Sequence, residues 1–135
     1  MPTFLLKTEP GTFAFADLVR DGGCVWDGVT NAQALINLRA MSKGDDVLVY
    51  HTGDEKQIVG LAKVSRGAYP DPKQDNEKLV VVDLKPVKAA KSPMTLAAIK
   101  ADPRFKEFLL VKNSRLSVMP VPAPLDKLIR AATGL

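Results

Sequence analysis

The apolar residues of this chain fall into several short runs, and long βαβ repeats are absent, a pattern that disfavours a doubly wound fold. Leu79-Val80-Val81-Val82 is a β-branched run typical of a buried strand, and Val47-Leu48-Val49-Tyr50 follows a Gly44-Asp45 turn. Tyr69-Pro70-Asp71-Pro72 is predicted to be a non-helical loop, because each proline fixes φ and biases its predecessor toward extended geometry. The pattern predicts an α+β, β-dominated fold, with a mixed, barrel-like sheet and short helices.

The remaining elements are predicted from apolar spacing and capping residues. Strands are expected at Phe4–Lys7, Ile58–Val64, Leu109–Val111 and Leu116–Val118. Helices are expected after the caps Thr12 and Asn31, from Ser92-Pro93 to about Ala101, and through the amphipathic segment Leu125–Ala132. Neither a linker nor a repeat divides the sequence, so one domain over residues 1–135 is predicted.

Composition limits the class of protein further. Cys24 is the single cysteine, which excludes an intramolecular disulfide and a cysteine-based zinc site and is typical of the reducing cytosol. No run of about 18 apolar residues is present, so neither a membrane span nor a membrane partner is expected. Lys7 and Glu9 interrupt the first apolar run, unlike in a signal peptide. A cytoplasmic location is therefore predicted. The net charge of +4 is compatible with nucleic acid but is too common to indicate it.

The usual catalytic and cofactor motifs are missing from the sequence. It contains neither a GxxxxGK[ST] phosphate loop nor a GxGxxG after a strand, and His51 has no second histidine for a metal site. Ser114 and Ser117 lie outside any GxSxG turn, and no signature surrounds Cys24. We predict no catalytic residue, no cofactor and no metal. One enzymatic alternative stays open, in which Glu9 and His51 act as an acid–base pair on a nucleotide.

Two polar-aromatic segments suggest a binding pocket. Trp26-Asp27-Gly28-Val29-Thr30-Asn31 holds the only tryptophan, and Tyr50-His51-Thr52-Gly53 holds the only histidine. An aromatic face can stack on a ligand, glycine permits close approach of backbone, and amide or imidazole groups contact a polar edge. Either rare residue could instead be a core residue. Arg115, between two serines, is either a charge at a strand edge or a phosphate clamp.

Five segments taken in order resemble the EVE domain family, which is similar in fold to the PUA-like superfamily that includes YTH domains. They are FLLKTEP, WDGVTN, LRAMSKGDDVLVYH, IVGLAKVSRGAYPDP and LLVKNSRLSVMPV, and the resemblance covers the chain from residue 4 to about residue 130. The resemblance implies a PUA-like pseudo-barrel with flanking short helices. It also implies a non-catalytic module that accepts a modified base, such as 5-methylcytosine or an oxidised form in DNA, or N6-methyladenine in RNA for the YTH relatives.

The resemblance also implies which residues bind the ligand. They are Lys7, Thr8, Glu9, Trp26, Gly28, Val29, Asn31, Tyr50, His51, Arg115 and Ser117. The chain departs from the family motif WDGVRNYQARN at Thr30, Ala32 and Leu35, which replace an arginine, a tyrosine and a second arginine. Modified DNA or RNA is the expected partner. The missing positive charges keep a second hypothesis open, in which the ligand is a free nucleoside or another small molecule.

Overall fold

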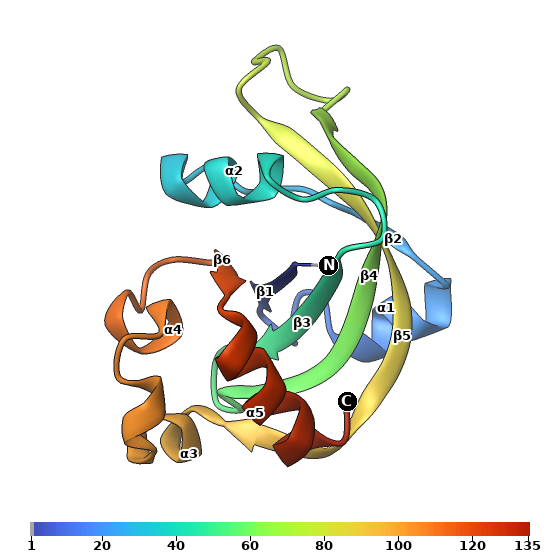
Figure 1. Cartoon of the computed structure of the whole chain (residues 1–135). Helices are drawn as coiled ribbons and strands as arrows, with labels where there is room; N and C mark the ends of the chain where they lie inside the picture. Colours follow the sequence, from blue (N-terminus) through green and yellow to red (C-terminus); the bar gives the residue numbers. More distant parts are fainter. Residues whose placement is uncertain (1) are drawn as a thin grey trace.

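The computed structural model of the chain describes residues 2–135 (Figure 1). Its elements are β1 (Thr3–Thr8), α1 (Phe15–Asp21), β2 (Cys24–Trp26), α2 (Ala32–Arg39), β3 (Asp46–His51), β4 (Gln57–Pro70), β5 (Val80–Thr95), α3 (Leu96–Ala101), a 3₁₀ turn (Pro103–Phe105), α4 (Leu109–Lys112), β6 (Val118–Val121) and α5 (Ala123–Thr133). More residues lie in strands than in helices, which confirms the predicted α+β, β-dominated class. No helix within residues 2–135 has the length and hydropathy that a membrane crossing requires.

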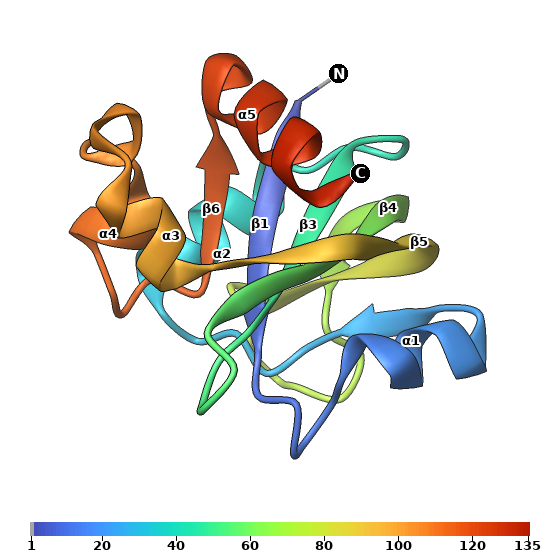
Figure 2. The same ribbon diagram turned by 90° about the horizontal axis from the view of Figure 1, so that it is seen from below.

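The strands form one mixed sheet in the order β2-β5-β4-β3-β1-β6. β1 and β3 are parallel and every other neighbouring pair is antiparallel. β4 and β5 are 14 and 16 residues long, and their pairing shifts register at several bulges, which bend and twist a sheet. Figure 2 shows β5 running across β1 and β3 as the sheet curls. The barrel-like sheet predicted from the sequence is therefore confirmed.

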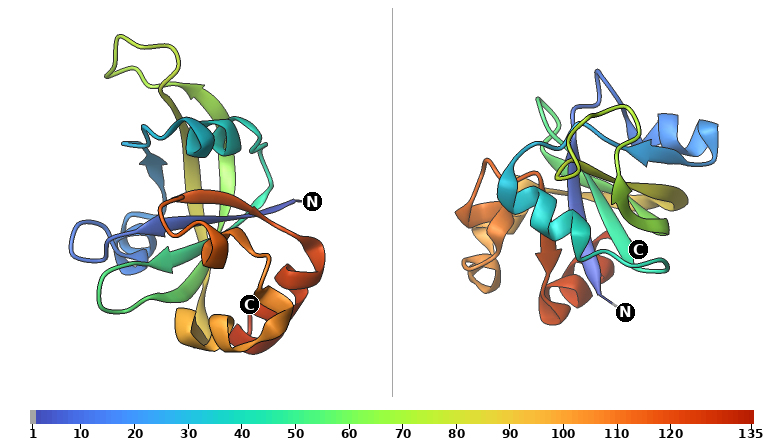
Figure 3. Two further views of the ribbon diagram at one scale, coloured as in Figure 1. Left: turned by 90° about the vertical axis from the view of Figure 1, so that its left-hand side faces the viewer. Right: turned by 90° about the horizontal axis from the view of Figure 1, so that it is seen from above.

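Helices flank the curled sheet at both ends. In Figure 3 the β4–β5 hairpin extends past α2 at one end, while α3, α4 and α5 gather at the other. α2 is tied to β6 because the buried Asn37 side chain donates from Nδ2 to the Val118 carbonyl at 2.7 Å. α5 is tied to the sheet by Arg130, which contacts Asp126 on its own helix and Asp46 at the start of β3, each at 2.9 Å.

α1 rests on the sheet through Phe15. Its ring packs against Gly60 in β4, where an added Cβ would lie only 2.5 Å from Phe15 Cζ. The backbone N–H of Phe15 donates to His51 Nε2 at the end of β3, at 3.0 Å. Glycine is therefore required at position 60 by the close approach of an aromatic ring, and the first turn of α1 is held at a fixed point above β3 and β4.

Some element boundaries differ from the sequence predictions. The prediction that Thr12 caps α1 is wrong, because Ala14 occupies the cap position and the Asp17 carboxylate accepts its N–H at 2.8 Å. Asn31 caps α2 as predicted, since its Oδ1 accepts the Ala34 N–H at 3.0 Å. The loop predicted at Tyr69–Pro72 is also partly wrong, because β4 runs through Pro70.

Two later predictions are wrong for a shared physical reason, which is long-range pairing and packing. Ser92-Pro93 do not begin a helix, because β5 continues to Thr95 by pairing with the start of β4, and Thr95 then caps α3. Leu109–Val111 belong to α4 rather than to a strand. The buried Phe105 and Phe108 anchor this helical turn to the core.

The contact between Phe15 and Gly60 gives a stability prediction. We expect Gly60→Ala to lower the free energy of unfolding by about 1–3 kcal/mol, because the added methyl overlaps a buried aromatic ring and forces the packing to shift. Chemical denaturation would measure the difference. Gly11→Ala is the matched control, since a Cβ there would meet Glu9 Oε1 at an ordinary 3.6 Å. Equal stability of the Gly60→Ala variant and the wild type would contradict this packing.

Candidate functional site

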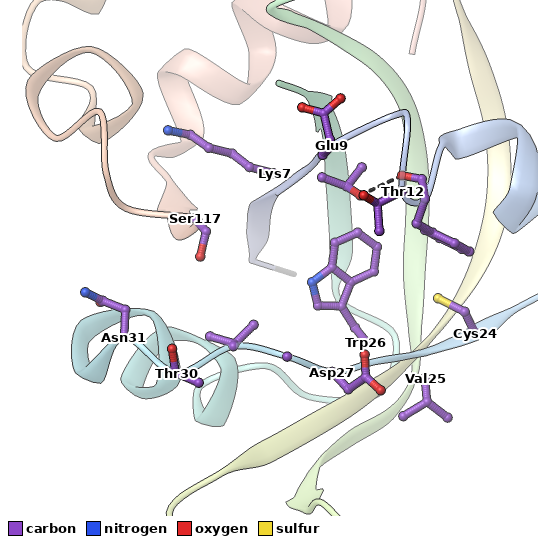
Figure 4. A pocket seen from close by; sticks show the side chains of 14 residues that line it. Lys7, Glu9, Thr12, Cys24, Val25, Trp26, Asp27, Thr30, Asn31 and Ser117 are labelled. Atoms are coloured by element: carbon purple, nitrogen blue, oxygen red, sulfur yellow. Dashed lines mark hydrogen bonds between the residues drawn. The ribbon is translucent and has the colours of Figure 1, made fainter. Parts of the chain in front are cut away.

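A pocket of about 490 Å³ opens between the end of β1, the turn that follows it, and the β2–α2 connection (Figure 4). Ser117, just before β6, completes its wall. The lining residues are Lys7, Thr8, Glu9, Thr12, Phe13, Cys24, Val25, Trp26, Asp27, Gly28, Val29, Thr30, Asn31 and Ser117. Most of the residues predicted from the sequence are brought together here, whereas Tyr50, His51 and Arg115 are not part of the lining.

The turn after β1 folds back on itself and presents an aromatic ring to the pocket. The N–H groups of Thr12 and Phe13 both donate to the Glu9 carbonyl at 2.9 Å. The Thr8 hydroxyl donates to the Phe13 carbonyl at 2.6 Å, which closes the turn. Phe13 consequently meets the Trp26 ring edge-on, with centroids 6.0 Å apart and an interplanar angle of 83°. This edge-to-face contact fixes the indole ring.

Trp26 supplies the aromatic wall of the pocket. It ends the edge strand β2, where it pairs with Val82 of β5, and the residue is 9% exposed. Figure 4 shows the indole nitrogen turned toward Ser117 and Asn31. Within residues 2–135 the indole N–H donates to no protein acceptor. Every fully buried side-chain nitrogen or oxygen in this range has a hydrogen-bond partner, so the indole nitrogen is not fully buried. Trp26 therefore offers a ligand both part of a ring and one hydrogen-bond donor.

Asn31 and Ser117 approach the opening from opposite walls (Figure 4). The Asn31 Oδ1 is occupied as the cap of α2, so the amide NH₂ is the part that can serve a ligand. The backbone carbonyl of Ser117 accepts the Lys7 N–H at 2.9 Å, which positions the Ser117 side chain at the wall. Gly28, with φ of 78°, allows the left-handed turn that carries the chain from Trp26 toward Asn31.

Two charged residues of the lining, Lys7 and Glu9, are turned toward protein partners. Lys7 Nζ donates to the Ser114 carbonyl at 2.9 Å and lies 5.9 Å from the centroid of the Tyr50 ring. Burial lowers the pKa of the Lys7 ammonium. Glu9 Oε2 accepts from the Thr52 hydroxyl at 3.2 Å, and Figure 4 shows this carboxylate pointing away from Trp26. Neither charge is aimed at the centre of the pocket.

His51 is buried, and both of its ring nitrogens are hydrogen-bonded within the protein. It is 7% exposed, and its Nε2 accepts the Phe15 N–H at 3.0 Å. Because Nε2 is an acceptor, the ring proton lies on Nδ1, which donates to Glu55 Oε1 at 3.0 Å. That hydrogen bond lowers the pKa of Glu55. Both ring nitrogens are thus engaged, and the pairing with Glu9 on which the enzymatic alternative depends is not formed.

Tyr50 and Arg115 also lie outside the pocket. Tyr50 is 3% exposed and belongs to the core, where burial raises the pKa of its hydroxyl. Arg115 is exposed in the connection between α4 and β6, two residues before Ser117. Arg115 is therefore near the pocket along the chain but does not contribute to its wall.

Cys24 lines the pocket as a protonated thiol. Burial raises its pKa to about 11, and the charges of Asp27, Asp83 and Asp21 add to the effect. A thiol of this pKa carries little thiolate near neutral pH, so it is a poor nucleophile. Among residues 2–135 no group of three or more His, Cys, Asp or Glu side chains is arranged to hold a metal ion.

Several lining residues were not predicted from the sequence. The sequence pattern places Thr12 at a helix cap and gives no indication that Phe13 lines a pocket. Phe13 carries a weak signal, since an aromatic residue two positions before Phe15 is off the apolar face of the helix that follows. Thr30 differs from the arginine of the family motif, so the motif does not identify it as a lining residue. Finding these residues requires the fold of the turn after β1, which depends on contacts distant in sequence.

Comparisons with known proteins agree on one family. The EVE domain matches residues 3–132 of this chain. Human thymocyte nuclear protein 1 is 34% identical over 153 aligned positions, covering 87% of this chain and 68% of that protein. The solution structure of Rpa0253 from Rhodopseudomonas palustris is 43% identical with a TM-score of 0.94, covering 99% of this chain and 94% of that one.

A structure of human thymocyte nuclear protein 1, or THYN1, contains DNA. Human THYN1 protein in complex with 5-methylcytosine-containing DNA is 30% identical to this chain, with a TM-score of 0.89. The match covers 97% of this chain and 96% of that one. The structural likenesses confirm the PUA-like architecture that the sequence resemblance implied.

The environment of His51 gives a second stability prediction. We expect His51→Ala to lower the free energy of unfolding by about 1–3 kcal/mol, because the buried Phe15 N–H loses its acceptor. Thermal or denaturant unfolding would measure it. Glu55→Gln is the control, because the amide oxygen still accepts from Nδ1 and the side chain is exposed, so stability should hardly change. A His51→Ala variant as stable as the wild type would contradict the structural role.

The raised pKa of Cys24 gives a reactivity prediction. Below pH 11 the thiol stays largely protonated, and only the thiolate reacts. A rise from 9.0 to about 11 lowers the thiolate population at neutral pH on the order of a hundredfold. Alkylation by iodoacetamide, followed by mass spectrometry, should therefore be much slower for the folded protein at pH 8 than for the urea-unfolded protein, and should accelerate toward pH 10. Equal folded and unfolded rates at pH 8 would refute this.

Proposed function

This chain belongs to the EVE domain family, and on that basis we propose that residues 1–135 form one non-catalytic, nucleic-acid-binding domain. The pocket beside Trp26 accepts a modified base, such as 5-methylcytosine or an oxidised form, from DNA or RNA. The structure of human THYN1 protein with 5-methylcytosine-containing DNA supports this class of ligand. The engagement of both His51 nitrogens supports binding rather than acid–base catalysis.

The observation that carries the proposal is the pairing of one aromatic wall with several unused donors. A base can stack on Trp26, and its polar edge then faces the indole N–H and the Ser117 hydroxyl, with the Asn31 side chain at the mouth of the same pocket. The volume of about 490 Å³ lies in the range of roughly 300–1,000 Å³ typical of small-molecule sites. A pocket of this kind accommodates an extruded base better than it does a peptide or a phosphate group.

The energetics show what each group must contribute. Extruding a base from a duplex costs a few kcal/mol, and stacking on one aromatic ring returns roughly 1–3 kcal/mol. Burying one methyl group contributes about 0.8 kcal/mol, which corresponds to about fourfold in affinity. A methyl group alone therefore gives modest selectivity. Stronger selectivity for a modified base requires hydrogen bonds from Trp26, Asn31 or Ser117 to a further polar substituent.

A free nucleoside is the second candidate ligand. Thr30 places a neutral hydroxyl at the pocket, and Lys7 is turned toward the Ser114 carbonyl, so the wall offers little positive charge to a phosphate. The two candidates differ in their response to salt. Nucleic-acid affinity falls steeply as salt rises, whereas a neutral nucleoside is nearly insensitive to it. The cytoplasmic location predicted from the sequence remains a prediction.

The proposal is tested by the fluorescence of Trp26, the only tryptophan. Short oligonucleotides that differ at one base would carry cytosine, 5-methylcytosine, 5-hydroxymethylcytosine or N6-methyladenine. We expect quenching that depends on the modification, because the modified base stacks on the indole ring. A flat response across the series at low salt, together with quenching by a free modified nucleoside, would favour the second candidate. No response to any of them would overturn both.

The Asn31 amide can be isolated in the same assay. Asn31→Ser keeps an equally good helix cap but removes the amide NH₂, so stability should hold while affinity for the preferred base falls about three- to tenfold, the effect of one hydrogen bond. Ser114→Ala is the control, because Ser114 holds Lys7 through its backbone carbonyl alone. Unchanged affinity of Asn31→Ser would remove Asn31 from the recognition set.

A further inference from the structure

Arg66 differs from most arginines of the chain in having no protein acceptor. Arg20, Arg104 and Arg130 donate to carboxylates, and Arg39 donates to a backbone carbonyl. Arg66 forms neither an ion pair nor a side-chain hydrogen bond with any residue in the described range 2–135, and it is exposed. Arg115 is the other exposed arginine whose side chain has no protein acceptor in this range. Such a guanidinium is available to an external anion, provided that its position is fixed.

Tyr69 fixes the position of Arg66. The guanidinium carbon lies over the Tyr69 ring, 3.7 Å from its centroid, and the Tyr69 hydroxyl donates to Asp83 Oδ1 at 2.5 Å. Asp83 is directly opposite Arg66 in the β4–β5 pairing and would be its ordinary partner, but the Tyr69 hydroxyl engages that carboxylate. Stacking uses the face of the guanidinium and leaves its in-plane N–H donors free.

The strand register connects Arg66 to the pocket. Val25 of β2 is opposite Asp83 of β5, and Asp83 is opposite Arg66 of β4. Val25 and Asp83 are directly paired and project from the same face of the sheet. Arg66 lies at a bulge and is placed on that face by Tyr69, which it covers and whose hydroxyl contacts Asp83, so the three side chains form one row about 10 Å long, equal to two strand spacings. Val25 lines the pocket and is 51% exposed. The row therefore begins at the pocket rim and crosses the sheet from its β2 edge to Arg66.

We propose that Arg66 binds a backbone phosphate of the nucleic-acid strand whose modified base occupies the Trp26 pocket. The inference rests on the proposed function and adds the residue that holds the flanking backbone. A fixed guanidinium with free in-plane donors matches the oxygens of a phosphate. The pocket itself cannot supply this contact, because its lysine is turned to a carbonyl and its other charged side chains are the carboxylates of Glu9 and Asp27. The strand passes over the β2 edge, with the base on the Trp26 face and the phosphate on the Arg66 face.

The test compares Arg66→Gln with the wild type for a duplex oligonucleotide containing the preferred modified base, over a series of salt concentrations. One phosphate contact contributes a slope of about 0.9 in the logarithmic salt dependence, equivalent to roughly fivefold in affinity at 0.15 M salt. We expect that loss of slope and affinity, with the ratio of modified to unmodified binding unchanged. The free modified nucleoside should bind both proteins equally, since it carries no phosphate.

Two further variants separate a specific contact from a general effect of charge. Arg104→Gln removes the same charge from an arginine already paired with Asp102, and it should keep the wild-type slope. Tyr69→Phe keeps the ring and the net charge but releases Asp83 to pair with Arg66, so it should weaken oligonucleotide binding as Arg66→Gln does. Wild-type slope and affinity in Arg66→Gln would overturn this inference alone. A wild type that binds no oligonucleotide would overturn the proposed function and the inference together.

Discussion

The anchoring of Phe15 is the contact on which the candidate site depends. Its ring occupies the space left by Gly60, and its backbone N–H is held by His51 Nε2 at 3.0 Å. These contacts fix the start of α1 above β3 and β4, and the residues just before Phe15 form the turn that closes the pocket. Phe13 can press on Trp26 only because that turn is held at both ends, by β1 and by α1. The histidine therefore serves the pocket from a distance.

The sequence correctly predicted those helices and strands whose ends are set by residues a few positions away in the chain. Asn31 caps α2 through its own side chain, and the apolar segment after Gly44 forms β3, because both depend on residues a few positions away. The segments at Ser92 and Leu109 were assigned wrongly for the opposite reason. The first is held in a strand by the start of β4, and the second turns as a helix beside buried aromatic residues.

The candidate site, like the elements, was predictable from sequence only where it depends on residues a few positions apart. Trp26 and Asn31 flank a glycine in one short segment, so their association with a pocket follows from sequence and turn chemistry. His51 looked like a ligand group for equally local reasons, but its role is set by a residue 36 positions earlier in the chain. Phe13 carried almost no signal, since its position follows from the Thr8 hydrogen bond that closes the turn. Chemistry could be predicted from residue types, whereas orientation required the tertiary structure.

The arrangement of charge separates two tasks that a nucleic-acid-binding domain has to perform. Inside the pocket, Lys7 is satisfied by the Ser114 carbonyl, and the ligand groups that we propose are neutral donors, so discrimination between bases would not depend on ionic strength. Outside it, Arg66 is exposed and without a carboxylate partner among residues 2–135, so any attraction it exerts on a phosphate is screened by salt. Base selectivity would then reside in the pocket and the salt-dependent part of the affinity in Arg66, on opposite faces of β2. Substitution at the edge of the sheet could accordingly tune how tightly the domain holds a strand without altering which base it accepts.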